Sequence, residues 1–407
     1  MSKDNSDFFK VKNEWSAAKD ELLACYLKPY FAKIVFTRHP VQYIDCFSGK
    51  GMFEDGTNGS PIIALDIAIE CLEKTKSTFA KIDMTFIEMV HADDLKTNLD
   101  KYSKSVPELK TSIISGKYED YIEKLLQRKQ KDNVFLYIDP FGIKAIDFSI
   151  FDRLSKKNFY SLELLINLNS FGFIREACRV MKVSFDIVLD DFFIESAVSE
   201  SLEGSIQILT MIAGGDYWKE IINDMKNGVI DGYEAEKIFA EEYCRQLKMR
   251  FKYVLDMPVR LKQGHRPKYR MIHATNHEDG CLLMNENMYN RWQTKILKLQ
   301  SGGQQKLFPE DSENNIIDYD FIKSKLLEMV KSNEDESGIE INILLAEFIS
   351  KHGARYSTKD IRDQVKILDN ENKIEIFRVP AKTKTGKDSS FWEPDKKQSL
   401  KIKAKKK

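Results

Sequence analysis

The sequence contains no long apolar run and no closely spaced pair of cysteines. Because no stretch of about 18 consecutive apolar residues occurs, we expect no membrane span. The six cysteines lie at least 20 positions apart, which argues against a zinc site of paired cysteines and against a disulfide framework. The N-terminus, MSKDNSDFFK, has acidic residues where a secretory signal needs a basic start and an apolar stretch. These absences predict a soluble cytoplasmic protein with reduced thiols.

An excess of charge of either sign is also missing. The 63 basic residues balance the 63 acidic ones, which excludes a globally basic nucleic-acid coat protein but leaves room for a local basic face. Apolar residues make up 42% of the chain, enough for a sizeable core. At about 100–200 residues per domain, 407 residues indicate two or three domains.

Short apolar runs alternate with amphipathic segments through the first half of the chain. The runs cover residues 41–47, 84–89, 111–115, 134–139 and 162–168. The amphipathic segments cover residues 61–74, 94–102, 118–128, 147–156 and 171–180. Nearly continuous apolar runs are typical of parallel strands buried on both faces, and the alternation implies βαβ units. The pattern predicts a doubly wound, Rossmann-like α/β domain, preceded by an N-terminal helix within residues 1–40 that packs on the core.

The second half of the chain changes character several times. Residues 181–250 read as a helical insertion, 251–284 as a long hairpin, and 301–317 as a polar linker. Residues 318–394 have the order helix, strand, helix, helix and two-stranded wing, with wing strands at 374–378 and 389–392, which is the order of a winged-helix domain. The last 13 residues, 395–407, carry seven lysines and predict a basic disordered tail.

The sharpest local signal is a strand that ends in an acid and continues into a glycine-bearing loop. This loop, Asp45-Cys46-Phe47-Ser48-Gly49-Lys50-Gly51, leads to a helix with Ser60 at its N-cap and Pro61 behind it. Its glycines would let the backbone approach a ligand closely, although a tight turn is the plain alternative. Glu54 replaces the third glycine of the dinucleotide fingerprint, so NAD is disfavoured, and no P-loop sequence occurs.

A second buried strand also ends in an acid. Asp139-Pro140-Phe141-Gly142 follows the fourth apolar run, 94 residues after Asp45. In a doubly wound sheet the first and fourth strands are neighbours at the topological switch point, where ligands bind at the carboxyl ends. We therefore expect both carboxylates to face one crevice. The plain alternative is that the tetrapeptide is only a strand-ending turn.

These motifs resemble those of class I S-adenosylmethionine-dependent methyltransferases. The first resembles their motif I, D-x-F-x-G-x-G, and Asp139-Pro140-Phe141-Gly142 resembles the motif IV of amino-methyltransferases. More closely, the chain resembles the three-Cys-motif partner protein family (TcmP) over residues 8–290. The shared landmarks are Trp15, Lys19, Tyr26, the motif I loop, Gly59-Ser60-Pro61, the DPFG turn and the late hairpin.

The resemblance implies a methyltransferase-like domain over residues 41–300 and a small companion protein with a three-cysteine motif. It assigns S-adenosylmethionine binding to Asp45, Phe47, Gly49, Gly51, Glu88 and Tyr118, with Glu88 accepting from the ribose hydroxyls. It assigns the catalytic role to Asp139, Pro140, Phe141 and Gly142, which would hold and stack on a base carrying an exocyclic NH₂ group.

Two departures from the methyltransferase pattern stand out. The loop at residues 52–59 is unusually long. Lys117 stands where such enzymes commonly place an acid for the adenine amino group, and a lysine cannot accept that hydrogen bond. Glu119 or Asp120 could accept it if the turn is displaced.

Basic residues in the hairpin turn indicate contact with a polyanion. Arg260, Lys262, Arg266 and Lys268 occur without an acid, and Arg270 extends the run. We predict that the first four bind substrate phosphates beside the target base, the alternative being a solvated hairpin. The predicted wing (Arg378, Lys382, Lys384, Lys387) is also basic, although such a domain can equally dock a protein.

The leading hypothesis is therefore an S-adenosylmethionine-dependent methyltransferase that acts on an exocyclic amino group of a nucleic-acid base, DNA or RNA. The rival is a non-catalytic methyltransferase-like scaffold that binds nucleic acid and the companion protein. We predict no metal, because the histidines show no ligand spacing beyond His273 and His277, which lie in a predicted strand.

Overall fold

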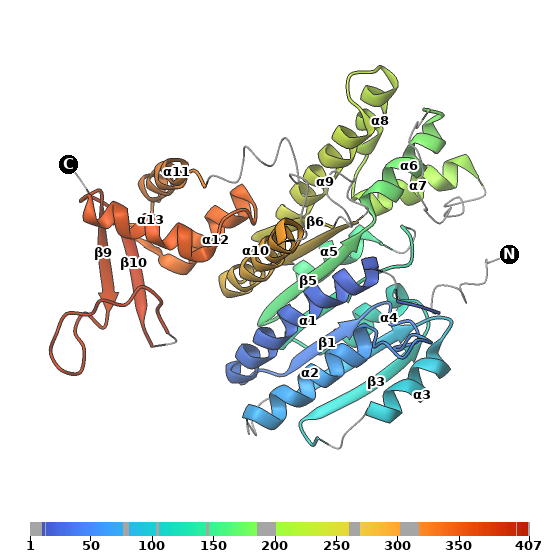
Figure 1. The fold of residues 1–407 in the computed structure, drawn as a ribbon, viewed down its shortest axis with the longest axis horizontal. Helices are drawn as coiled ribbons and strands as arrows, with labels where there is room; N and C mark the ends of the chain where they lie inside the picture. Colours follow the sequence, from blue (N-terminus) through green and yellow to red (C-terminus); the bar gives the residue numbers. More distant parts are fainter. Residues whose placement is uncertain are drawn as a thin grey trace. The chain divides into compact units, whose positions relative to one another are not determined.

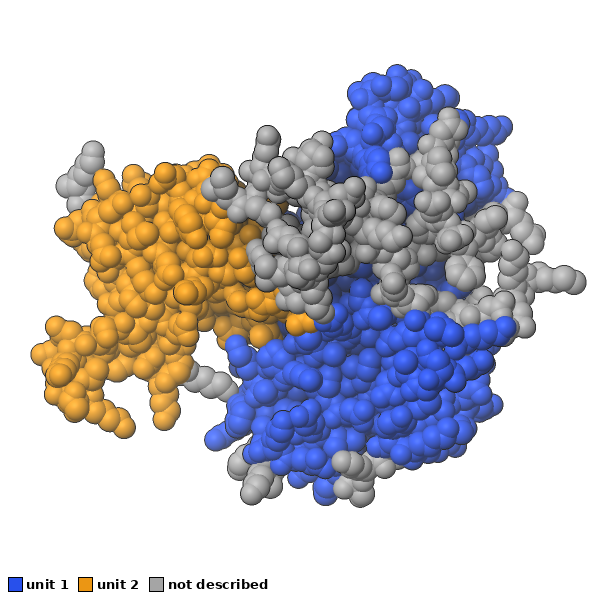
Figure 2. Space-filling view, viewed as in Figure 1, with its two compact units in different colours: residues 1–276 blue, residues 277–407 orange. Residues whose placement is uncertain are grey.

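The computed structural model describes most of the chain and divides it into two compact units. Unit 1 is Met1–Asn276 and unit 2 is His277–Lys407 (Figure 2). The described residues are 10–12, 14–75, 81–102, 106–143, 146–184, 201–259, 269–301, 317–395 and 397–405. No helix among them is both long and apolar enough to cross a membrane. All six cysteines are free.

Unit 1 is built on a seven-stranded mixed sheet with the order β3-β2-β1-β4-β5-β7-β6 (Figure 1). The strands are β1 (Val41–Asp45), β2 (Ile82–Glu88), β3 (Leu109–Ser115), β4 (Asn133–Ile138), β5 (Ser161–Leu168), β6 (Tyr253–Val259) and β7 (Tyr269–Thr275). The first five are parallel, and β7 runs antiparallel to both β5 and β6. This arrangement is consistent with a Rossmann-like methyltransferase fold, and it confirms the predicted strands and their doubly wound order.

Helices cover both faces of this sheet. On one side lie α1 (Glu14–Ile34), α2 (Ser60–Thr75) and α3 (Ala92–Tyr102). There, Phe31 of α1 contacts Tyr43 of β1, whose ring stacks on Phe135 of β4 at 5.8 Å. On the other side lie α4 (Tyr118–Leu125), α5 (Phe148–Ser155) and α6 (Ser170–Met181), packed on residues such as Ile44 and Leu136. Because β1, β4 and β5 are buried on both faces, most of their residues are apolar and few polar side chains interrupt them.

The predicted helical insertion follows α6. Its described helices are α7 (Leu202–Ala213), α8 (Trp218–Lys226) and α9 (Gly232–Lys248), and they share the core on the α5 side of the sheet. Gly214 ends α7 with φ +69°, and a Cβ there would meet the Phe148 ring at 2.6 Å. Gly214 is therefore a helix terminus where only glycine fits.

The late hairpin is β6–β7, but its second strand is shorter than expected. The hairpin was predicted to extend to residue 284, whereas β7 ends at Thr275 and α10 (Glu278–Ser301) begins three residues later. Cys281, Met284 and Met288 are buried at helical spacing, so the apolar residues after Gly280 form one face of a helix.

Unit 2 contains α10, three more helices and a small antiparallel sheet. The elements are α11 (Tyr319–Ser332), β8 (Ile339–Glu340), α12 (Ile341–His352), α13 (Thr358–Asn370), β9 (Ile374–Val379) and β10 (Ser399–Ala404). The helix–strand–helix–helix order was predicted. Ser357 is the N-cap of α13, and its hydroxyl accepts from the Asp360 N–H. The winged-helix class itself stays a prediction.

Three expectations for this region are wrong. The tail 395–407 was predicted to be disordered, yet β10 is the central strand of the sheet, with Leu400 and Ile402 fully buried between lysines. Residues 389–392 form no strand; β9 pairs with β10 instead. The boundary near residue 300 is misplaced, because α10 packs on α12 within unit 2. The interior of the predicted linker, 302–316, lies outside the described residues.

Candidate functional site

The two strand-ending carboxylates lie on adjacent strands at one edge of the sheet. β1 and β4 are parallel, with Asp45 in register with Tyr137, and the Cys46 N–H donates to the Tyr137 carbonyl at 2.9 Å. Asp139 follows two residues later. The charge of Asp139 contributes to the raised pKa of Asp45, so the two carboxylates are close enough to repel each other. The two carboxylates are therefore neighbours at this edge, and their facing one crevice stays a prediction.

Asp45 is fully buried and fastens the two ends of the glycine loop. Its Oδ2 accepts from the Ser60 hydroxyl at 2.7 Å, and its Oδ1 accepts from the Phe47 N–H at 3.2 Å. Burial raises the pKa of the Asp45 carboxyl to about 7, against the opposing effect of these hydrogen bonds. Asp45 is thus a buried anchor that joins β1 to the start of α2.

Two glycines give the loop its shape. Gly49 has φ +57° and Gly51 has φ +76°, which side chains with a Cβ rarely adopt. The Gly49 N–H donates to Glu88 Oε2 at 2.9 Å, while Glu88 Oε1 accepts from the N–H groups of Val90 and His91 at 2.8 and 3.1 Å. A carboxylate has about four acceptor positions, so Glu88 keeps one for another donor.

The long loop after Gly51 is ordered and tied to the N-terminal segment. The Gly59 N–H donates to the Gly51 carbonyl at 2.8 Å, which closes the loop, and α2 then begins at Ser60. The Lys12 ammonium donates to the Asn58 carbonyl at 2.6 Å and pairs with Asp20 of α1 at 2.7 Å. The segment before α1 therefore braces the loop that leads out of the glycine turn.

Asp139 is held by three groups of the chain itself. Its Oδ1 accepts from the Lys19 ammonium at 2.8 Å and from the Asn167 amide at 2.5 Å. Its Oδ2 has a longer contact of 3.3 Å with the Tyr137 hydroxyl. The Lys19 and Asp139 side chains are only 10% and 18% exposed, and Lys19 also lies 5.0 Å from the centre of the Tyr269 ring. One carboxylate oxygen is thus saturated and the other is lightly engaged.

Lys19 is a landmark of the resemblance, and its contact with Asp139 was not predicted. A signal was available, because Lys19 precedes Leu22, Leu23 and Tyr26 by three, four and seven residues and so falls on the apolar stripe of α1. A lysine on a buried stripe requires a partner, and the DPFG acid is that partner. Asn167, a polar residue in a strand buried throughout, carries a similar signal.

The rest of the DPFG turn projects from the sheet edge. Pro140 is buried, Gly142 has φ +85°, and the Phe141 ring is 57% exposed. An exposed aromatic ring next to a held carboxylate is the arrangement expected of a platform for a planar group.

Phe47, Tyr118 and Glu119 lie beside the glycine loop. Tyr118 is buried, its ring centre lies 5.1 Å from that of Phe47, and its hydroxyl accepts from the Asp147 N–H at 3.4 Å. Its position is that of a support for Phe47. Glu119 is half-buried, burial raises its pKa, and its charge helps to raise the pKa of the Cys46 thiol. Glu119 therefore lies near the loop, whereas Lys117 is exposed.

None of the four residues predicted to bind phosphate belongs to the described part of the chain. Arg260, Lys262, Arg266 and Lys268 lie outside it, so their role stays a prediction. Arg270, which extends the basic run in sequence, is instead buried: it pairs with Glu236 of α9 at 2.7 Å and with Asp256 of β6 at 2.7 Å. Arg270 is a structural residue and offers no free charge to a polyanion.

A buried polar cluster lies under α1, further along the sheet. The Tyr26 hydroxyl donates to Glu163 Oε2, and His273 Nε2 contacts the same oxygen at 2.9 Å. Tyr26 and His273 therefore both serve as core contacts to Glu163. Among the described residues, no group of three or more His, Cys, Asp or Glu could hold a metal ion.

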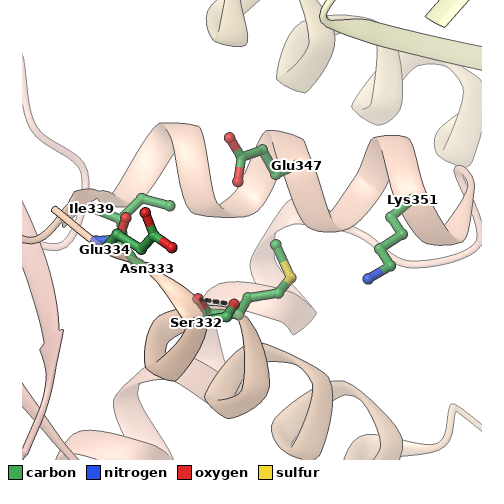
Figure 3. Close-up of a pocket in the computed structure, with 7 residues that line it drawn as sticks. Ser332, Asn333, Glu334, Ile339, Glu347 and Lys351 are labelled. Atoms are coloured by element: carbon green, nitrogen blue, oxygen red, sulfur yellow. Dashed lines mark hydrogen bonds between the residues drawn. The ribbon is translucent and has the colours of Figure 1, made fainter.

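A hollow of about 470 Å³ occurs elsewhere, in unit 2 (Figure 3). Glu347 and Lys351 of α12 line it together with Ser332, Asn333 and Glu334 at the end of α11. None of its lining residues is fully buried. It therefore offers a ligand no desolvated polar group and does not compete with the sheet edge as a candidate site.

Comparison with known proteins adds little to this geometry. No protein-family model and no curated protein matches the chain. The loganic acid methyltransferase structure with SAH is 9% identical, covers 72% of this chain and 86% of its own, and has a TM-score of 0.27. A DUF574 family protein from Streptomyces avermitilis is 12% identical, with 64% and 87% covered and a TM-score of 0.26. At these scores the fold assignment rests on strand order alone, and the resemblance to the three-Cys-motif partner family stays a prediction.

Proposed function

We propose that the chain is an S-adenosylmethionine-dependent methyltransferase whose target is an exocyclic amino group of a nucleic-acid base. The observation that carries the proposal is the juxtaposition of Asp45 and Asp139 at the carboxyl ends of the adjacent strands β1 and β4. Each belongs to a turn with a positive-φ glycine, which lets backbone groups reach a ligand. Donor and acceptor molecules would meet between these turns.

The acidic side chains at this edge suit the donor molecule. S-adenosylmethionine carries one net positive charge, and its approach would favour the ionised form of Asp45, whose pKa burial raises to about 7. In this proposal its methionine part lies against Gly49 and Gly51.

Two further carboxylates would contact the nucleoside part of the donor. Glu88 would use its remaining acceptor position for a ribose hydroxyl. Glu119 would accept from the adenine amino group, in place of the acid that Lys117 replaces. When bound, the donor molecule supplies an electrophilic methyl group.

The acceptor side is formed by the DPFG turn. Asp139 Oδ2, the lightly engaged oxygen, and the Pro140 carbonyl would accept hydrogen bonds from the two N–H groups of the target amine. Phe141 would stack on the base. The nitrogen lone pair would then point at the methyl carbon; the C–N bond forms as the C–S bond breaks, and the nitrogen loses its proton afterwards. Alignment and electrostatic stabilisation would supply most of the rate enhancement.

The ion pair between Lys19 and Asp139 limits which kind of amine the site could methylate. Because the Lys19 ammonium already neutralises Asp139, the site has no unpaired acid to attract a protonated amine. A neutral, planar amine, such as that of a nucleobase, is a better match than a lysine side chain. A base within a duplex would need to be flipped out, at a cost of a few kcal/mol.

The proposal also includes two partners, a nucleic acid and a companion protein, which are supported only by the sequence and by the family resemblance. The loop at 260–268 would contact the phosphates beside the target base, and a small three-cysteine-motif protein would be the companion.

The rival is a non-catalytic scaffold, and one observation favours it. Asp45, Glu88 and Asp139 are all engaged by groups of the chain itself. In a protein without cofactor, these carboxylates would serve only to hold the loops.

Isothermal titration of the full chain with S-adenosylmethionine and S-adenosylhomocysteine separates the two. Binding in the micromolar range supports the enzyme, and no heat at millimolar ligand supports the scaffold. With binding established, transfer of labelled methyl to DNA and RNA pools is measured. Asp139→Ala should lower transfer by roughly 10²–10³-fold with little change in cofactor affinity. Glu241→Ala, which removes an exposed acid of α9, is the control. Full activity of Asp139→Ala would refute the assigned role.

A further inference from the structure

The segment between β9 and β10 contains a projecting hairpin that adds nothing to the core. Residues 379–388 are all exposed, and Figure 1 shows the connection extending from the end of β9 as a bare loop. Ten consecutive exposed residues bury little apolar surface, so their contribution to folding is small. Folding therefore places little constraint on which side chains these residues carry, and the side chains can serve in binding.

The hairpin is nevertheless ordered. Lys382 and Asp388 form an antiparallel bridge, and the Thr383 N–H donates to the Lys387 carbonyl at 2.8 Å. The Gly386 N–H returns to the Thr383 carbonyl at 2.9 Å, with Gly386 at φ +82°. The result is a narrow two-stranded ribbon whose side chains are held in fixed positions. Such preorganisation lowers the entropy lost on binding.

Its base is fastened to the sheet. The Arg378 Nε donates to the Phe391 carbonyl at 2.9 Å, and the guanidinium lies 5.0 Å from the centre of the Trp392 ring. Lys366 of α13 lies 5.9 Å from the same ring. The ribbon is thus carried by β9 and by the segment that returns from it toward β10.

The charge of this region differs from that of the chain. Residues 374–405 contain nine basic and four acidic side chains, a net charge of +5, in a protein of zero net charge. At the tip, Lys382, Lys384 and Lys387 have no ion-pair partner among the described residues. The remaining tip side chains are Thr383, Thr385 and Asp388, and no aromatic ring is present. The tip therefore offers phosphate-binding donors and no stacking surface.

We propose that this ribbon, residues 381–388, enters a groove of B-form DNA and contacts the flanking phosphates through Lys382, Lys384 and Lys387. The wide major groove of B-DNA admits a two-stranded ribbon, whereas the major groove of an A-form RNA duplex is too narrow. The absence of rings at the tip disfavours a single strand, which is bound by stacking. The proposal rests on the proposed function for its choice of a nucleic-acid substrate, and it names duplex DNA as that substrate.

The test measures binding and is independent of catalysis. Fluorescence anisotropy of the full chain with a labelled 20-bp DNA duplex is recorded over a salt series. For the variant Lys382→Gln/Lys384→Gln/Lys387→Gln, the slope of log K against log [salt] should fall in magnitude by about 2–3, and affinity near 0.1 M salt by roughly 10²-fold. All three residues are exposed, so the variant should fold, which its melting curve checks.

The control carries the same charge change elsewhere. Lys28→Gln/Lys33→Gln/Lys96→Gln alters exposed positions on α1 and α3 of unit 1 and should keep the wild-type slope. Equal slopes for wild type and the tip variant would overturn the proposal, as would no DNA binding. Equal affinity for an RNA duplex would also overturn it. Displacement of the DNA by polyglutamate at equal charge would overturn it in favour of an acidic protein partner. Titration of the same preparations with S-adenosylmethionine reports on unit 1 alone, so a failure here is distinguishable from failure of the proposed function.

Discussion

Single residues decide whether the sheet edge is a working site, and Lys19 is the most informative of them. Its ammonium is the only cation in contact with Asp139 among the described residues, and both side chains are largely shielded from water. Removing one member of a shielded pair leaves the other without compensation. The contact therefore predicts a stability effect that is independent of any activity.

Lys19→Met should lower the free energy of unfolding by about 1–3 kcal/mol, because it strands the Asp139 carboxylate. Lys28→Met, on an exposed position of the same helix, should stay within about 0.5 kcal/mol of wild type. The double variant Lys19→Met/Asp139→Asn should recover most of the loss, since no charge is then left unpaired. Urea unfolding of the four proteins measures these values, and equal stability of Lys19→Met and Lys28→Met would contradict the importance of the pair.

Asp45 predicts a dependence of stability on pH. Its pKa is about 7 in the folded protein, against a usual value of 3.8, mainly because of burial. The folded state then holds this proton more tightly than the unfolded state, so its contribution to stability decreases as pH rises from about 4 to about 7. Asp20, with a pKa raised to about 6 by burial, acts in the same direction.

Asp45→Asn removes the largest of these contributions. Relative to wild type, the variant should gain stability as pH rises from about 4 to about 7 and level off above that, because it has no carboxylate to bury. Urea unfolding at four pH values gives the difference curve, with Asp55→Asn, an exposed acid on the neighbouring loop, as the control. A flat difference curve for Asp45→Asn would show that the carboxyl is ionised throughout this range.

At the scale of elements, the sequence predicted unit 1 much better than unit 2. Strands such as β1 and β5 are buried on both faces, so their apolar runs were unambiguous. β10 was missed because its two buried residues alternate with lysines that face outward, and seven lysines in 13 residues suggested disorder. The alternation of apolar residues and lysines that is typical of a strand was present but short. The high lysine content favoured a disordered tail instead.

Loss of β10 should unfold unit 2. A chain ending at Gln398 lacks Leu400 and Ile402, whose burial contributes roughly 3–6 kcal/mol together, and leaves β8 and β9 without a partner strand. We expect rapid proteolysis within residues 319–379. A chain ending at Lys405 keeps the whole strand and should resist protease like the full chain. Equal resistance of the two truncated chains would show that β10 is dispensable.

For the molecule as a whole, the sequence pattern predicted the architecture of unit 1 and the two motif acids. The side-chain pairs that join distant elements became known only from the structure. Asp45 and Asp139 could be placed at one edge because the order of parallel strands follows from topology. Lys19 on Asp139 and Arg270 on Glu236 join residues 120 and 34 positions apart, and no local pattern specifies such partners. Arg270 is an example of the resulting error. The run of basic residues was interpreted as one surface, although Arg270 belongs to the core.

The middle position of β10 also constrains the order of events during synthesis. Neither β8 nor β9 pairs with the other; both pair only with β10, the last of the three to leave the ribosome. The small sheet therefore cannot close until residue 404 has emerged, and until then the apolar sides of β8 and β9 remain open to chaperones. In the large sheet, β1 to β5 are all made before β6 and β7 complete the edge. Nascent chains should thus acquire a protease-resistant first half well before the second.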